Sequence, residues 1–147
     1  MSTRILTGLM IAALAACNGS PFGAEPELSG VYDLVEADGD GLPVEVWSGE
    51  SHEMTLISEE LEFRPGGLVV RTSQTVTTEL ATSDGEVTEE VQEVEYRING
   101  PGISMGRFDP CPPNAFCLPN DIGVVRGDRV EVQSYRWTGG ILVYQRR

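Results

Sequence analysis

One histidine and three cysteines are the side chains of this sequence best suited to chemistry. His52 lies between Ser51 and Glu53, and a serine, a histidine and a carboxylate can together form a hydrolytic site. No G-x-S-x-G motif places a nucleophile, so an exposed loop histidine is the favoured interpretation and we assign no catalytic residue. A single histidine does not make a histidine-rich zinc site, and a cysteine-based one would use up thiols expected in a disulfide. We therefore expect neither a metal nor another cofactor.

An acidic segment in the first half of the chain offers a second arrangement that could bind a metal ion. Glu36, Asp38 and Asp40 alternate ahead of Gly41, which is similar to the opening of a calcium loop. The EF-hand pattern then requires a bidentate glutamate at its twelfth position, where this sequence has Trp47. A hairpin turn accounts for the same residues without a metal, and it is the interpretation that we favour.

Cys17 ends a segment that has the layout of an export signal. Arg4 supplies a positive charge, and the apolar stretch 5–16 carries no charge. That stretch would form a helix of roughly 18 Å, shorter than a bilayer core of about 30 Å. A removable signal therefore fits better than a membrane span. Residues 14–17, with the sequence Leu-Ala-Ala-Cys, resemble the lipobox of bacterial lipoproteins.

The lipobox resemblance implies cleavage between Ala16 and Cys17 and attachment of a diacylglycerol, with further acylation such as palmitate, to that cysteine. More than one acyl chain is needed for stable anchoring, at about 0.8 kcal/mol per buried methylene. Asn18 stands where an aspartate favours retention in the inner membrane, so we expect the periplasmic face of the outer membrane. Residues 17–27 then form a lipidated, flexible tether. The alternative is an ordinary secretory signal with a cysteine at the cleavage point.

The other two cysteines lie in a single proline-rich loop. An oxidising compartment favours a disulfide between Cys111 and Cys117. A redox-active pair is the alternative, although the spacing is not C-x-x-C and nothing basic lies between the two thiols. The ring is small, so the stabilisation would be at most about 2–3 kcal/mol.

The charge of the chain restricts its partners. It has 23 acidic residues and ten basic ones, all arginine, for a formal net charge of −13, which becomes −14 if Arg4 is removed. So negative a protein is not expected to bind nucleic acid or to adsorb to anionic lipid, which leaves the lipid anchor as the membrane contact. Acidic residues gather over the range 84–95. They could form a cation or partner surface, but a solvated hairpin edge protected by charge is favoured.

The elements that position these residues form one domain, 28–147, which we predict to be all-β. The pattern of apolar residues and turn signals predicts strands at 28–36, 54–63, 68–80, 102–108, 122–126, 129–137 and 141–146, with a brief one at 42–46 before a loop at 47–51. About eight antiparallel strands in up-and-down order are best closed into a small barrel, because closure removes exposed edges.

The segment 86–98 is ambiguous between strand and helix. Val87, Val91, Val94 and Ile98 have the spacing of one helix face. We predict a strand, because an Asp-Gly turn before the segment and a Thr- and Val-rich stretch ahead of that turn require an antiparallel partner.

Three stretches resemble the small bacterial lipocalin-like domains that often follow lipoprotein signals. They are 30–34 (GVYDL), 41–43 (GLP) and 61–67 (LEFRPGG). The last predicted strand contains 142–146 (LVYQR), and lipocalins close their barrel with an arginine packed over the aromatic residue of the first strand, a cation–π contact. The resemblance implies a barrel that holds a small apolar ligand, although a small eight-stranded barrel can also be filled by its own side chains.

Five aromatic residues could line such a pocket, or equally form a packed core, which we favour: Tyr32, Trp47, Tyr135, Trp137 and Tyr144. We expect a non-enzymatic envelope lipoprotein whose barrel binds a small apolar molecule or an envelope protein. A filled barrel with a structural or interaction role is the alternative, and an enzyme is the least favoured hypothesis.

Overall fold

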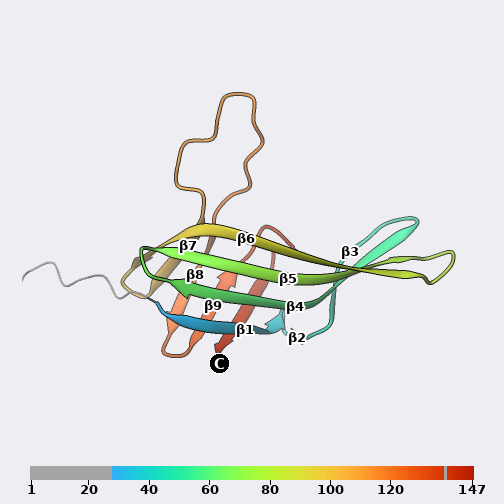
Figure 1. Cartoon of the computed structure of the whole chain (residues 1–147), viewed down its shortest axis with the longest axis horizontal. Helices are drawn as coiled ribbons and strands as arrows, with labels where there is room; N and C mark the ends of the chain where they lie inside the picture. The colour runs from blue at the N-terminus through green and yellow to red at the C-terminus, as the bar shows by residue number, and fades with distance from the viewer. Residues whose placement is uncertain (1–27, 138) are drawn as a thin grey trace, which may run out of the picture.

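Ten β-strands form the regular structure in the computed structural model, which describes residues 28–137 and 139–147. The strands, shown in Figure 1, are β1 (Gly30–Ala37), β2 (Asp40–Gly41), β3 (Val44–Ser48), β4 (His52–Arg64), β5 (Leu68–Glu79), β6 (Gly85–Asn99), β7 (Gly102–Gly106), β8 (Asp121–Arg126), β9 (Arg129–Gln133) and β10 (Ile141–Arg146). Within the described ranges, no helix is long and apolar enough to cross a membrane. The predicted signal, its cleavage site at Ala16 and Cys17, and the tether lie outside these ranges.

Eight of the strands form a closed, antiparallel, up-and-down barrel, as predicted from the sequence. The order around the ring is β1-β10-β9-β8-β7-β6-β5-β4, and β4 pairs with β1 to close it. β2 pairs only with β1, and β3 only with β4. With β3, the adjoining halves of β4, β5 and β6 project beyond the ring as a four-stranded arm, on the right of Figure 1.

The first strand closes the ring between the last strand and β4. Tyr32 pairs with Arg146 on one side and with Leu61 on the other. A Cβ built on Gly30 would lie 3.3 Å from Nε of Arg146, so the absence of a side chain there gives the guanidinium its room. Arg146 thus lies against Gly30, and the stacking on Tyr32 that the resemblance implied is not among the cation–π contacts of the described residues.

Part of the barrel interior is filled with apolar side chains. The ring of Phe63 makes edge-on contacts with Tyr32 and Tyr96, at centroid distances of 5.3 and 5.1 Å. Around these rings pack buried aliphatic side chains from strands on all sides, among them Leu34, Leu61, Val69, Ile98, Ile103, Met105, Val130, Val132 and Leu142. The positions predicted to face inward on β4, Leu61 and Phe63, are both buried.

The ambiguous segment is strand β6, so the strand prediction is confirmed. It pairs with β5 without a register shift from Leu68 opposite Glu95 to Thr78 opposite Gly85. Its apolar residues lie on two faces, because Val87 and Val91 are exposed while Ile98 is buried. The predicted two-residue Asp-Gly turn is wrong, since residues 80–84 connect the strands. Two further boundaries also differ: Trp47 lies in a strand, and β9 ends before Trp137.

Candidate functional site

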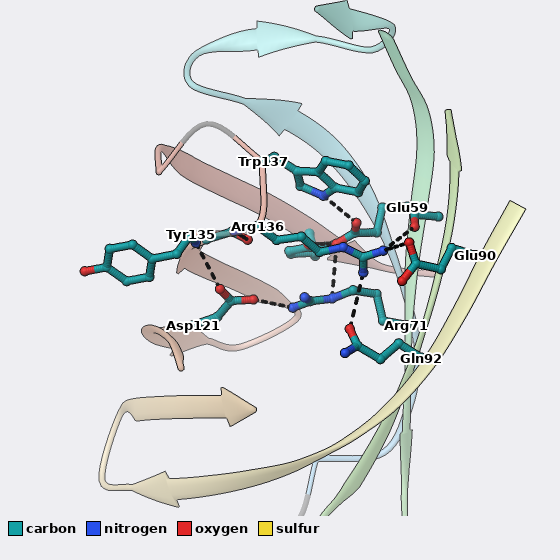
Figure 2. Close-up of polar contacts among 11 residues, drawn as sticks. Glu59, Arg71, Glu90, Gln92, Asp121, Tyr135, Arg136 and Trp137 are labelled. Atoms are coloured by element: carbon teal, nitrogen blue, oxygen red, sulfur yellow. Dashed lines mark hydrogen bonds and ion pairs between the residues drawn. The ribbon is translucent and has the colours of Figure 1, made fainter. Parts of the chain in front are cut away.

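The part of the barrel interior that is not apolar contains a buried ion cluster of Glu59, Arg71 and Asp121. Nε of Arg71 lies 3.3 Å from Oε1 of Glu59, and its Nη2 lies 2.5 Å from Oδ2 of Asp121. All three side chains are at most 7% exposed. Glu59 lies on β4, Arg71 on β5, and Asp121 is the first residue of β8, so one guanidinium joins three strands of the ring (Figure 2).

Two neutral donors complete the hydrogen bonding of Glu59. The hydroxyl of Tyr144 donates to Oε1 at 2.5 Å, and Nε1 of Trp137 donates to Oε2 at 2.7 Å. Burial raises the pKa of Tyr144 well above its usual value, and the neighbouring carboxylate raises it further, so the phenol stays protonated and donates. Burial alone would lower the pKa of Arg71, but the carboxylates of Glu59 and Asp121 raise it, so the guanidinium stays charged.

A second arginine crosses from the β9–β10 connection to β5 and β6. Nη2 of Arg136 lies 2.6 Å from Oε2 of Glu90 and donates to Oγ of Ser73 at 3.3 Å. Its Cζ lies 4.7 Å from the ring centroid of Trp137, a cation–π contact. Figure 2 shows this side chain close to the ion cluster, with contacts on the strand of Glu90 and Gln92. Arg136 therefore links the inner face of β6 to the cluster through Trp137.

A long loop leaves the barrel where β7 ends. Gly106 has φ 143°, and a Cβ there would lie 2.5 Å from Oδ1 of Asn120. The same oxygen accepts a hydrogen bond from the backbone N–H of Arg107 at 3.0 Å, so the two ends of the loop are held together at its base. We call residues 107–120 the disulfide loop, because Cys111 and Cys117 form a disulfide, as the sequence predicted, with their Cα atoms 6.0 Å apart.

An open cleft of about 720 Å³ lies between β6 and the disulfide loop. Arg71, Asp121 and Arg136 of the polar interior reach it, together with apolar side chains from the barrel and the loop: Val94, Met105, Phe108, Phe116 and Leu118. Pockets that hold small molecules in proteins are typically about 300–1,000 Å³ and combine apolar walls with a few polar groups. The cleft has that size, and its apolar wall stands beside a polar one that also includes Glu93, Glu95 and Asp109.

The aromatic residues proposed from the sequence lie at separate places. Tyr144 and Trp137 meet at Glu59, and Tyr32 lies in the apolar core. Trp47 is 53% exposed on β3. Tyr135 is 41% exposed, and none of the five aromatic residues is among those that line the cleft. The buried polar residues that reach the cleft, Arg71 and Asp121, were not identified from the sequence.

The residues considered for catalysis or metal binding lie at the surface. His52 is exposed at the start of β4, with its Nδ1 2.8 Å from Oγ of Ser51. Asp38 and Gly39 both have positive φ, at 52° and 91°, between the paired residues Ala37 and Asp40, as a two-residue hairpin requires. The hairpin interpretation of the acidic segment is thus correct. In the part of the chain that is described, no three His, Cys, Asp or Glu side chains are grouped to hold a metal ion.

Comparison of the chain with protein-family models, with curated proteins and with solved structures found no match.

Proposed function

We propose that this protein is a lipid-anchored lipoprotein of the cell envelope whose barrel binds a small molecule in the cleft beneath the disulfide loop. The observation that carries this proposal is the joint lining of the cleft by apolar side chains and by the arginines of the polar interior. The binding site is then at the side of the barrel, because the apolar part of the interior is filled by its own core. The role is binding and not catalysis.

The lining indicates a ligand with an apolar body and one polar group. Phe116 and Leu118, which are 88% and 55% exposed, offer apolar surface from the loop, while Val94 and Met105 offer it from the barrel. Burying such surface on both sides of a ligand provides the main driving force for binding. Arg71 and its neighbours would then orient the polar group, since charge-assisted hydrogen bonds are strong where water is excluded.

Residues 14–17 and the disulfide support the envelope location. The Leu-Ala-Ala-Cys stretch has the order that lipidation of Cys17 requires, and disulfides persist in oxidising compartments outside the cytoplasm. With Asn18 after the cysteine, the proposed place is the periplasmic face of the outer membrane. The net charge of −13 makes a lipid anchor the expected means of membrane attachment.

Binding in the cleft is testable with N-phenyl-1-naphthylamine, an apolar dye whose fluorescence rises in a dry site. The protein used is the full chain with Cys17→Ser, which cannot be lipidated. We expect saturable binding that Leu118→Asp weakens about tenfold or more, which corresponds to 1.4 kcal/mol. Leu80→Asp is the matched control, because Leu80 is 47% exposed in the β5–β6 connection and does not line the cleft. No saturable binding, or equal losses in the two variants, contradicts the proposal.

The anchor has a separate test. Cys17→Ala is expected to move the protein from the membrane fraction to the soluble fraction of cells. Mass spectrometry of the N-terminal peptide from the unmodified protein is expected to show a diacylglyceryl cysteine. Unchanged membrane attachment of the variant would contradict lipid anchoring.

A further inference from the structure

Residues 85–94 of β6 have a neighbouring strand on one side only. They pair with β5 along their whole length, whereas β7 begins to pair with β6 only at Glu95, opposite Gly106. In Figure 1, this stretch forms one edge of the four-stranded arm. No other described strand pairs with its free side. An unpaired row of backbone N–H and C=O groups is a template on which another strand can add.

The edge lacks the usual obstacles to strand addition. It contains no proline, and its pairing with β5 has no bulge. β3, at the opposite edge of the arm, is shorter and has a register shift between Glu45 and Trp47. The described edge of β6 is protected against strand addition by negative charge, which comes from Glu86, Glu89, Glu90 and Glu93.

This protection selects between partners. A second copy of this acidic chain would be repelled, because like charges on directly paired strands destabilise the pair. A basic strand would be attracted by the same side chains. Glu90 already has Arg136 at 2.6 Å and Glu93 has Arg64 at 3.8 Å, but no arginine pairs with Glu86 or Glu89 among the described residues. Glu89 accepts a hydrogen bond from Gln74 at 3.0 Å, which leaves its negative charge uncompensated, so both glutamates can attract a basic partner.

The side chains along the edge indicate the sequence that would fit. On the outer face, Val87 and Val91 are 65% and 61% exposed, and they alternate with Glu89 and Glu93. An added strand would bury the two valines under β-branched residues of its own and place basic residues opposite the glutamates. The preferred pattern on that face is therefore apolar, basic, apolar, basic.

The edge also leads into the cleft. Gln92, Glu93 and Val94 belong both to the free edge and to the lining of the cleft. A strand added along 85–94 would therefore end beneath the disulfide loop, where exposed apolar side chains such as Phe116 could cover it. The edge therefore adjoins the cleft, and a strand added along it would meet the proposed small-molecule site at one end.

We propose that the free edge of β6 takes up an extended basic segment of another protein as an additional strand, with Lys or Arg alternating with β-branched residues. This goes beyond the small-molecule site and does not depend on it. The interaction would combine backbone hydrogen bonds, which accept any sequence, with the charges of Glu86 and Glu89, which select a basic one.

The test uses a fluorescently labelled peptide, VKKTVKKT, with both ends blocked. Fluorescence anisotropy at low salt is expected to show saturable binding to the full chain with Cys17→Ser. The acidic peptide VEETVEET is expected not to bind. A VKKTVKKT peptide that is N-methylated at alternate residues keeps its charge, but its methylated edge cannot form backbone hydrogen bonds with β6. Its affinity is expected to be lower by about tenfold or more. Equal binding of the methylated and unmethylated peptides would show charge attraction alone and would overturn strand addition.

Protein variants locate the site. The double variant Glu86→Lys with Glu89→Lys is expected to weaken binding about tenfold or more. Glu45→Lys with Glu50→Lys changes the charge equally beside the opposite edge of the arm and is expected to have a smaller effect. Amide hydrogen exchange of the unsubstituted edge provides a readout that does not depend on any edge variant folding. Added peptide is expected to protect outward-facing N–H groups within 85–94, and unchanged exchange there would overturn the proposal.

Discussion

Arg71 and Asp121 lie 50 positions apart in the chain and form a buried ion pair, with Nη2 2.5 Å from Oδ2. The same guanidinium faces Glu59, so two buried carboxylates share one positive charge. The excess negative charge is offset by the donors Tyr144 and Trp137 on Glu59 and by the backbone N–H of Tyr135 on Asp121. Removing Arg71 would leave two buried carboxylates without a compensating positive charge.

The substitution Arg71→Met is expected to destabilise the barrel by about 3–5 kcal/mol, because Glu59 and Asp121 would be left buried without a compensating charge. Urea unfolding at neutral pH measures the loss. The triple variant Arg71→Met, Glu59→Gln, Asp121→Asn removes the charges together and is expected to recover much of it.

Arg136→Met is the matched control. Its partner Glu90 is 61% exposed, so the loss is expected to be about 1 kcal/mol or less. Equal losses of unfolding free energy in the Arg71 and Arg136 variants would contradict the claim that burial makes the Arg71 ion pairs the more important ones.

Tyr144 is expected to make the protein sensitive to alkali. Burial and the Glu59 carboxylate hold its pKa well above 10, while the unfolded chain loses the same proton near pH 10. The stabilisation is thus fully present below about pH 10 and is lost as the pH rises further, by about 1.4 kcal/mol per pH unit. Tyr144→Phe removes this contribution, so its free energy of unfolding should fall less steeply between about pH 10 and 11. Urea unfolding across that range checks it, and identical slopes would contradict it.

The disulfide is expected to hold the loop more than the barrel. Its ring is small, so Cys111→Ser with Cys117→Ser should cost about 2–3 kcal/mol at most. The free energy of dye binding should fall by a larger fraction than the free energy of unfolding, because Phe116 and Leu118 of the cleft lie on the segment that the disulfide holds. Reduction of the unsubstituted protein should reproduce both effects. A variant that unfolds, or one that binds the dye as tightly as the parent, contradicts this division of roles.

Gly106→Ala tests the base of the disulfide loop. At φ 143° an alanine is strained, and its Cβ would displace the side chain of Asn120. The expected loss of stability is about 1–3 kcal/mol. Gly41→Ala is the control, since nothing lies within 4 Å of a Cβ at that position, and it should change stability by less than about 0.5 kcal/mol. Urea unfolding of both variants compares them, and a neutral Gly106→Ala would contradict the proposed close packing against Asn120.

The architecture was predictable because alternation and turn residues act locally. Leu61 and Phe63 alternate on β4 and are buried as predicted, and the Val- and Thr-rich β5 required β6 as its partner. Boundaries were less accurate where side chains override the local pattern. Trp137 fits a strand by composition, but it lies in the connection after β9, where its indole donates a hydrogen bond to Glu59.

The cleft and the ion cluster were not predictable in the same way, because their members lie far apart in the chain and meet only when the ring closes. A partial signal was present. Arg71 lies on β5, a strand rich in β-branched residues, and its side chain is on the same inward-facing side as those of Val69 and Ser73. A charged residue at such a position needs a buried partner. The sequence does not reveal that Glu59 and Asp121 are those partners.

The pairing of β1 with β10 determines at what stage of folding the barrel can close. The first strand of the ring bonds to the last one, and the side chains of Asp33 and Arg147, 114 positions apart, are hydrogen bonded. No portion of the chain that lacks β10 can therefore close the ring, so the barrel is completed only after β10 has been synthesised. Contacts between such distant residues also make folding slow, typically on a scale of about milliseconds to seconds. Until the last strand arrives, the nascent chain exposes two open sheet edges, so this protein is expected to depend on chaperones more than a helical protein of equal length would.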